Sequence, residues 1–358
     1  MHGQRVFIVN NANLKLRGKI KMKKFVMLFF SALLIILAGC SQTSQSPKET
    51  TAADSEKESQ IEYPTKPIEL LVPFSAGGST DIGARIIEKY IPKYLPDAKV
   101  VVVNKPGGAG SIAINDLFNS KPDGYTLAMS THRAISMEPL YGKVQYGHDS
   151  FQPIGKVFGN QQIFIVKADA PWQTLEELID YAKENPGEIS YGVSGGLRSG
   201  AHLPMAALEQ QAGFKANAVA FEGTPPAITA VLGGHVSGAM VQPSDAKDLI
   251  DSGELRGLFN VSSTPVPYLP DIPLLKDKGF DIVIDSNTSL FTTKGVPEEI
   301  VTMLVEALDK VMNDPEALAD FEKASLQTNY DGPDVVQEEV NEENERFGRM
   351  LKEVGFIE

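Results

Sequence analysis

The sequence predicts an α/β protein of about two domains. From Pro67 onward, short β-type runs alternate with segments of helical period, which is the pattern of consecutive strand and helix units. The chain has 358 residues, and at roughly 100 to 200 residues per domain it can build about two cores. Glycine-rich turns follow several of the expected strands. The composition excludes a disordered chain, a collagen-like fibre, a coiled coil and a disulfide scaffold.

Nine strands are expected, at residues 68–72, 100–104, 126–130, 163–166, 189–193, 216–220, 236–241, 255–261 and 282–285. Three helices are well marked. Thr174 and Glu177 form a capping box ahead of apolar residues at helical spacing. A second helix has Pro297 in its first turn, and a charged last helix covers residues 334–355.

The N-terminus has the pattern of a secretory signal peptide over residues 1–39. Three lysines precede the apolar run 25–38, which has fourteen residues and is too short to span a bilayer. The run ends in Leu-Ala-Gly-Cys, which resembles a bacterial lipobox and makes Cys40, the single cysteine, the expected site of lipidation. Residues 1–21 add nothing to this signal, so they are interpreted as an extension ahead of the start at Met22. Residues 40–62 are polar and are expected to form a flexible tether.

The charge balance is acidic. Without residues 1–39, the chain has 26 basic against 46 acidic residues. Such a surface repels nucleic acid and anionic lipid headgroups, so the acyl anchor is the only membrane contact expected. A single cysteine excludes an internal disulfide and a cysteine zinc site, and no metal is expected.

The first chemically informative turn is 73–81, which follows the first expected strand. Its paired glycines leave backbone N–H groups bare ahead of a helix start, which favours binding of an anion. No lysine follows the glycines, so the turn is not a nucleotide P-loop. The structural alternative is a tight turn capped by Ser79 or Asp81.

A second glycine-rich turn contains Gly108, Gly110 and Ala113, which fit the dinucleotide pattern G-x-G-x-x-A. The turn follows the second strand, and no acidic residue closes a next strand about 20 residues on. We interpret it as a helix entry that packs closely on the sheet, and no cofactor is expected.

The third turn, 191–202, contains a G-x-S-x-G motif centred on Ser194. A secreted serine hydrolase would need an acid and then a histidine, and the sole ordered triad is Ser194, Glu209 or Glu222, and His235. The glycines around the serine delay the helix that a nucleophile elbow requires. The favoured interpretation is a second anion site ahead of a helix over 200–212, and a core or cap role for His202 remains open. A fourth turn has Thr224 ahead of two prolines and exposes another helix start.

Seven segments in this order resemble the extracytoplasmic receptors of tripartite tricarboxylate transporters, the Bug family. They include YPTKPIELLVPFSAGGSTDIGAR, VVVVNKPGGAGSIA, KPDGYTLAMSTH, FEGTPPAITAVLGGHVSGAM and LPDIPLL, and the match runs from about Tyr63 to the C-terminus. The resemblance implies a two-lobed periplasmic-binding-protein fold of the second type with a ligand cleft between the lobes. The polar segments 167–171 and 285–289 flank a complete set of strands and helices, which predicts lobe 1 at 63–164 plus 289–358 and lobe 2 at 165–288. The resemblance further implies a binding protein, not an enzyme, that is lipid-anchored outside the bacterial cell membrane and delivers a small organic carboxylate to membrane permease subunits.

The resemblance also implies the ligand-binding residues. They are Phe74, Ser75, Gly77, Gly78, Ser79, Thr80 and Asp81 for one carboxylate; Ser194, Gly195, Gly196, Arg198, Ser199 and His202 for the opposite end; and Ser130, Thr131, Gly223 and Thr224 for the wall. The chain departs from the family pattern at Ser75, Ala76, Arg198 and Glu222. Arg198 would add a bidentate carboxylate contact, whereas Glu222 would favour a ligand with an amine or hydroxyl donor. A carboxylate-sensing surface protein is the third function considered.

Overall fold

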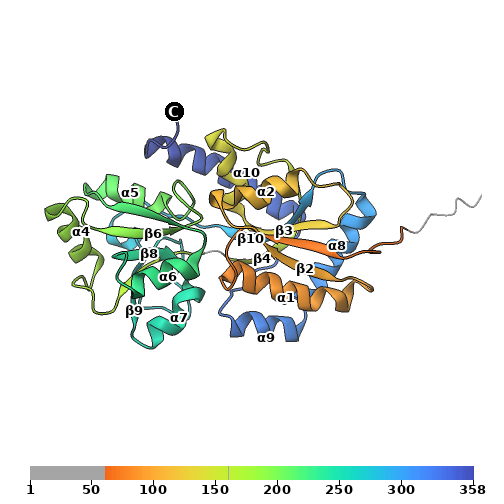
Figure 1. Ribbon diagram of the computed structural model, residues 1–358, viewed down its shortest axis with the longest axis horizontal. Coiled ribbons are helices and arrows are strands. Elements are labelled where there is room, and N and C mark those ends of the chain that lie inside the picture. The colour runs from red at the N-terminus through yellow and green to blue at the C-terminus, as the bar shows by residue number, and fades with distance from the viewer. Residues whose placement is uncertain (1–60, 160) are drawn as a thin grey trace, which may run out of the picture. The chain divides into compact units, whose positions relative to one another are not determined.

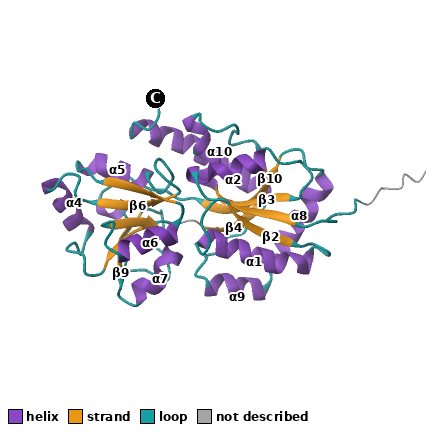
Figure 2. Cartoon of the chain, viewed as in Figure 1, coloured by secondary structure: helices purple, strands orange, loops and turns teal. Residues whose placement is uncertain are grey.

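The computed structural model describes residues 61–159 and 161–358, which form two five-stranded sheets with helices on both faces (Figures 1 and 2). The predicted α/β fold with two lobes is confirmed. The expected signal peptide, Cys40 and most of the tether lie outside the described residues. Within the described part, no helix is both long and apolar enough to cross a membrane.

The first sheet has the strand order β2-β1-β3-β10-β4. Its strands are β1 Ile68–Val72, β2 Val100–Asn104, β3 Thr126–Thr131, β4 Phe151–Gly159 and β10 Asn287–Thr293. β1 pairs in parallel with β2 and β3, whereas β10 is antiparallel to β3 and β4. One face is covered by α1 Ser79–Tyr94, α8 Glu298–Met312 and α9 Pro315–Lys323. The other is covered by α2 Ser111–Phe118, α3 His132–Ser136 and α10 Pro333–Glu353.

The second sheet has the order β7-β6-β8-β5-β9. Its strands are β5 Ile163–Lys167, β6 Ser190–Ser194, β7 Asn217–Phe221, β8 Gly238–Val241 and β9 Leu255–Asn260. α4 Leu175–Glu184 and α5 Leu203–Ala212 pack on one face, and α6 Thr224–Leu232 and α7 Pro243–Asp251 pack on the other. β6 is parallel to β7 and β8. Both sheets therefore have a set of parallel strands whose carboxyl ends meet at one edge.

The chain crosses between the sheets twice, once between β4 and β5 and once ahead of β10. β5 begins at Ile163 and β10 at Asn287, each two residues before the corresponding expected lobe boundary. The division at 164/165 and 288/289 stays a prediction of how the lobes move.

One expected strand is absent from the described structure, and two observed strands were not expected. The segment 282–285 is not a strand. Ile282 and Ile284 are buried in the second lobe, where the Ile284 N–H donates to the Val261 carbonyl oxygen at 2.8 Å. β4 was not predicted because it contains Pro153 and two glycines, Gly155 and Gly159; an edge strand tolerates proline. β10 was not predicted because it is rich in Thr and Ser.

Helix α10 is shared between the two lobes. Val336 and Val340, near its start, belong to the apolar core of the first lobe. Phe347 and Leu351, near its end, belong to the core of the second lobe. This helix therefore completes the burial of apolar surface in both lobes.

Candidate ligand-binding site

A cavity of about 580 Å³, counting the part open to solvent, lies between the turns that follow the parallel strands of both sheets. Phe74 and Ser75 follow β1, and Thr131 ends β3. On the other side, Ser194 ends β6 and Thr224 follows β7. The carboxyl edge of parallel strands is where open α/β sheets bind ligands.

Of the predicted site residues, those that line this cavity are Phe74, Ser75, Gly78, Ser79, Thr80, Thr131, Ser194, Gly195, Ser199 and Thr224. Those that do not are Gly77, Asp81, Ser130, Gly196, Arg198, His202 and Gly223. Whether the lining residues contact a ligand stays a prediction.

The start of α1 presents bare backbone donors to the cavity. Its N-cap is Gly78, which has no side chain of its own to cap the helix. The first intrahelical bond runs from the Ile82 N–H to the Gly78 carbonyl oxygen at 2.9 Å, so the N–H groups of Ser79 and Thr80 precede the helical ladder. Such groups, with the helix dipole behind them, stabilise an anion.

Asp81 holds this turn in place and does not face the cavity. Its Oδ2 accepts hydrogen bonds from the Gly77 N–H at 2.9 Å and from Arg85 Nε at 3.0 Å, and its Oδ1 accepts from Asn104 Nδ2 at 3.0 Å. Burial alone would raise the pKa of Asp81, but the hydrogen bonds from Arg85, Gly77 and Asn104 hold it below its ordinary value. The carboxylate therefore positions the turn.

The second turn is compact and uses several of its own donors. α5 begins at Leu203, three residues after the expected start. The Arg198 N–H donates to His202 Nδ1 at 2.8 Å, and Ser199 Oγ donates to the Ser194 carbonyl oxygen at 3.0 Å. Burial lowers the pKa of His202 to about 4, so it is neutral and structural in this arrangement.

The Arg198 side chain also lies away from the cavity. Its residue has a φ of 67°, and its guanidinium lies 6.0 Å from the ring centre of Tyr141 and 5.8 Å from that of Phe356. Tyr141 Oη donates to the Arg198 carbonyl oxygen at 2.6 Å. Because Tyr141 belongs to the first lobe, this contact joins the second turn to the first lobe.

The third helix start, that of α6, offers fewer donors than the sequence suggested. Gly223 is its N-cap, and Thr224 is its first residue. Pro225 and Pro226 follow, and neither has an N–H group. Two of the bare donors expected at this helix start are therefore absent.

Glycines of the second lobe permit close contact with the first. A Cβ atom on Gly223 would lie 2.0 Å from Ser75 Oγ, and one on Gly200 would lie 2.2 Å from Arg133 Cδ. Gly195, at a φ of 83°, has the Ala109 Cα 3.4 Å from its ideal Cβ position. The glycine-rich turns thus serve the approach of the lobes as well as the exposure of N–H groups.

Sequence reasoning missed eight lining residues, namely Ala109, Arg133, Ala134, Glu138, Gln162, Gly200, Ala201 and Gln242. Arg133 is 5% exposed, and burial lowers its pKa to about 10, so it remains cationic at neutral pH. Burial raises the pKa of Glu138 to about 8, which leaves it mostly protonated at pH 7. Arg133 and Gln242 closely follow the carboxyl ends of β3 and β8, and that position is the signal that could have identified them.

Asp245 of α7 places a carboxyl group next to the start of α1. Its Oδ2 is buried and has no hydrogen-bond partner in the described part of the chain. Burial raises the pKa of Asp245 to about 7, although the nearby Thr224 hydroxyl and the Ser79 N–H and hydroxyl oppose the shift. An ideal Cβ on Gly78 would lie 3.9 Å from this oxygen.

We expect Asp245→Asn to change the pH dependence of stability. A raised pKa means that the folded protein keeps a proton which the unfolded chain releases, so the stabilisation is present below about pH 4 and is lost as pH rises to about 7. The asparagine variant lacks this loss and should gain about 1 to 3 kcal/mol relative to wild type between pH 4.5 and 8. Urea unfolding of the ligand-free proteins at both pH values measures it. Glu138 and His202 titrate in both proteins, so their contributions to the unfolding free energy cancel in the comparison. If the stability difference between variant and wild type is the same at both pH values, the raised pKa of Asp245 is contradicted.

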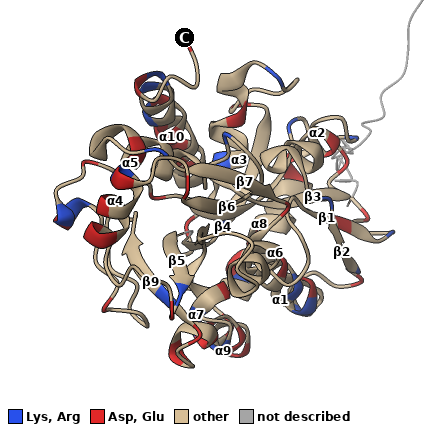
Figure 3. Ribbon diagram, turned by 60° about the vertical axis from the view of Figure 1, so that its left-hand side comes forward, with Lys and Arg blue, Asp and Glu red and all other residues tan. Residues whose placement is uncertain are grey.

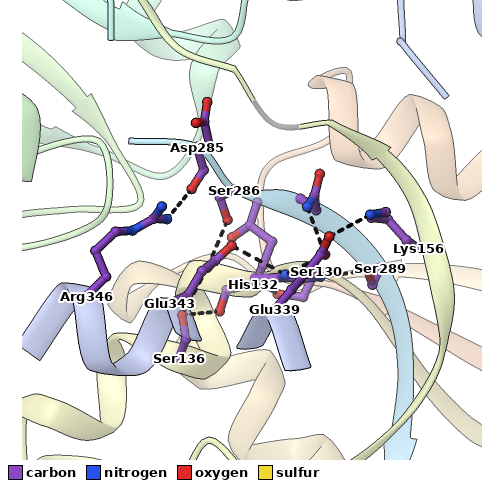
Figure 4. Close-up of polar contacts among 12 residues, drawn as sticks. Ser130, His132, Ser136, Lys156, Asp285, Ser286, Ser289, Glu339, Glu343 and Arg346 are labelled. Atoms are coloured by element: carbon purple, nitrogen blue, oxygen red, sulfur yellow. Dashed lines mark hydrogen bonds and ion pairs between the residues drawn. The ribbon is translucent and has the colours of Figure 1, made fainter. Parts of the chain in front are cut away.

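A second polar cluster lies where β10 enters the first sheet (Figure 4). His132 Nε2 is 2.7 Å from Ser289 Oγ, and its Nδ1 is 3.5 Å from Glu343 Oε1 on α10. Glu343 also accepts hydrogen bonds from the hydroxyls of Ser136 and Ser286, both at 3.3 Å. His132 and Ser289 are both 0% exposed, so this serine, histidine and carboxylate arrangement ties α10 to the crossing strand and is closed to a substrate.

The triad considered for a hydrolase is not assembled. Ser194 lies at the carboxyl end of β6, whereas His235 precedes the amino end of β8, which is parallel to β6. The two residues therefore lie at opposite edges of the sheet. Glu209 is engaged elsewhere, since it accepts hydrogen bonds from Tyr191 Oη at 3.0 Å and from the Ala216 N–H at 3.1 Å.

Charged residues are distributed over the outer helices, where both signs occur on α4 and α10 (Figure 3). Across residues 61–159 and 161–358, no group of three or more His, Cys, Asp and Glu side chains is arranged to hold a metal ion. Among the described residues that line the cavity, Arg133 and Glu138 are the ones with ionisable side chains.

Residues 84–356 match the protein family described as "Tripartite tricarboxylate transporter family receptor". The chain is 33% identical over 273 residues to a Cupriavidus necator protein described as "UPF0065 protein in gbd 5'region". The aligned region covers 73% of this chain and 80% of the relative. The solved periplasmic binding protein BugD has a TM-score of 0.76 and 28% identity, over 82% of this chain and 99% of that chain. The R. palustris protein Rpa4515, solved with adipate, has a TM-score of 0.76 and 26% identity over the same shares.

Proposed function

This chain belongs to the family of tripartite tricarboxylate transporter receptors, and from that premise we propose that it binds a small di- or tricarboxylate and delivers it to a membrane transporter. The observation that carries the proposal is the cavity between the lobes. The start of α1 supplies N–H groups that precede its helical ladder, and Arg133 supplies a buried cation. The adipate bound by Rpa4515 supports a dicarboxylate as the ligand.

Binding is expected to close the lobes. A ligand that contacts both sides of the cavity stabilises the conformation in which both sides are near, and it does so by its difference in affinity for the two states. Hydrogen bonds to a charged ligand contribute about 1.5 to 3 kcal/mol each in such a site. No step in this function requires a bond to be made or broken.

A thermal-shift screen against linear and hydroxylated di- and tricarboxylates tests the proposal. A ligand at 100 times its dissociation constant should stabilise the protein by about 2.7 kcal/mol. Matched monocarboxylates and amines serve as controls. If no carboxylate stabilises the protein, the proposal fails. Covalent labelling by a serine-directed phosphonate, lost in Ser194→Ala, would favour the hydrolase instead.

We further propose that Cys40 carries a lipid anchor that holds the receptor at the outer side of the cell membrane. The support is the short apolar run followed by Leu-Ala-Gly-Cys. Metabolic labelling with a fatty acid should mark the wild type and Ser44→Ala but not Cys40→Ser. Equal labelling of Cys40→Ser would exclude this anchor.

A sensing role would be favoured if the loaded receptor bound a sensor kinase in place of a permease.

A further inference from the structure

Arg133 belongs to the first lobe and lines the cavity between the two lobes. It lies in the short helix α3, directly beyond the carboxyl end of β3, and it is 5% exposed. Among the residues that line the cavity, it is the one with a cationic side chain. Removing a cation from water is costly unless nearby negative charge or hydrogen bonds compensate it.

The acidic residues near Arg133 lie mainly on its α10 side and not on its cavity side. Burial is the largest influence on its pKa; Glu343 and Asp285 favour its charged form, and Arg346 opposes it. These three residues belong to α10 and the crossing segment, not to the cavity lining. On the cavity side, Glu138 is the one acidic side chain among the described lining residues, and it is mostly protonated at pH 7 because burial raises its pKa to about 8. Asp245, whose pKa burial raises to about 7, lies next to the start of α1. An anionic ligand would therefore complement the charge that the lining presents.

The side chain of Arg133 is held against the opposite lobe. The ideal Cβ position of Gly200 is 2.2 Å from Arg133 Cδ and 2.6 Å from Nε. Any side chain at residue 200 would displace the arginine, so glycine at this position permits the observed placement of the Arg133 side chain. Thr131, Ser199 and Gln162 line the same cavity and offer further hydrogen-bonding groups.

Resting on the proposed function, we propose that Arg133 is a specificity-determining residue that binds one carboxylate of a dicarboxylate whose other carboxylate is held at the start of α1. A planar guanidinium binds a carboxylate through two parallel hydrogen bonds, whereas the α1 start can hold the second carboxylate through its backbone N–H groups. The site should therefore prefer a dicarboxylate over the monocarboxylate of the same chain length.

Calorimetry with two ligand pairs, adipate with hexanoate and succinate with butyrate, tests this role in the wild type and in Arg133→Met and Arg133→Lys. We expect the wild type to bind its better dicarboxylate at least tenfold more tightly than the matching monocarboxylate. Arg133→Met should weaken dicarboxylate binding about 100-fold and abolish the preference. Arg133→Lys, which keeps the charge but loses the bidentate geometry, should fall between them.

Three measurements keep the result interpretable. The preference for dicarboxylate over monocarboxylate is a ratio that a merely structural arginine would not alter, and ligand-free melting temperatures establish folding. Arg349→Met removes an exposed charge from α10 and should bind as wild type does. Arg198→Met tests the arginine that the sequence suggested as a carboxylate contact. A wild-type ratio in Arg133→Met, or its loss in Arg198→Met alone, would overturn the proposal, whereas a wild type that binds no carboxylate would contradict the proposed function itself.

Discussion

Replacing Gly223 with alanine is expected to weaken carboxylate binding roughly 5- to 150-fold while the ligand-free protein stays folded. The new Cβ would lie 2.0 Å from Ser75 Oγ and 3.2 Å from the Ser75 backbone nitrogen on the other lobe. Gly223 has a φ of −178°, an extended conformation that alanine adopts without strain. The clash therefore opposes the approach of the lobes and not the folding of either one. Overpacking of this kind costs about 1 to 3 kcal/mol, which corresponds to a roughly 5- to 150-fold loss of affinity.

Calorimetry and ligand-free melting curves measure the two effects separately. Gly332→Ala is the matched control because Gly332 is the N-cap of α10 and has no atom within 4 Å of its ideal Cβ position. The double variant Ser75→Ala with Gly223→Ala removes the nearest clashing atom and should recover part of the affinity. Unchanged binding in Gly223→Ala would show that the bound state does not require this approach.

Replacing Phe347 with alanine is expected to lower the free energy of unfolding by about 3 to 5 kcal/mol. Phe347 is 0% exposed and belongs to the core of the second lobe, although its helix also packs on the first. The truncation leaves a cavity where apolar atoms had been in contact. Because α10 joins the lobes, the loss should appear in signals from both of them.

Urea unfolding followed by two probes tests this expectation. Trp172, the single tryptophan, is buried in the second lobe and reports that lobe by fluorescence, while circular dichroism reports both. Val335→Ala is the control on the same helix, since Val335 is 41% exposed and should cost little. A loss below about 1 kcal/mol, or a loss seen only by fluorescence, would contradict a shared helix.

The fold could be predicted from the sequence where the local signals were strong. The capping box at Thr174 and Glu177 begins α4, with the Glu177 N–H donating to Thr174 Oγ1 at 3.2 Å, and the expected last helix corresponds to α10. The family resemblance drawn from the ordered segments was confirmed. β10 could not be predicted because its Thr and Ser residues are buried by pairing on both sides, which no local pattern reveals.

The candidate site was predictable only in part, for a similar reason. The turn after β1 could be recognised in the sequence by its glycines, and its residues Gly78, Ser79 and Thr80 line the cavity. Arg133 has no glycine-rich turn to mark it; its position just after β3 is the one local signal, and the fold places it against Gly200 in the other lobe. The reason for glycine at position 223 is likewise Ser75, which lies far away in the chain.

The sharing of α10 also bears on the order in which the chain can fold as it is synthesised. The first lobe lacks Val336 and Val340 from its core, and the second lacks Phe347 and Leu351, until the last residues of the chain have emerged. A nascent chain released residue by residue would therefore expose an unfinished apolar surface on both lobes until its C-terminus became available. Folding would then be completed late and in both lobes together, because each core lacks residues of the same helix until then.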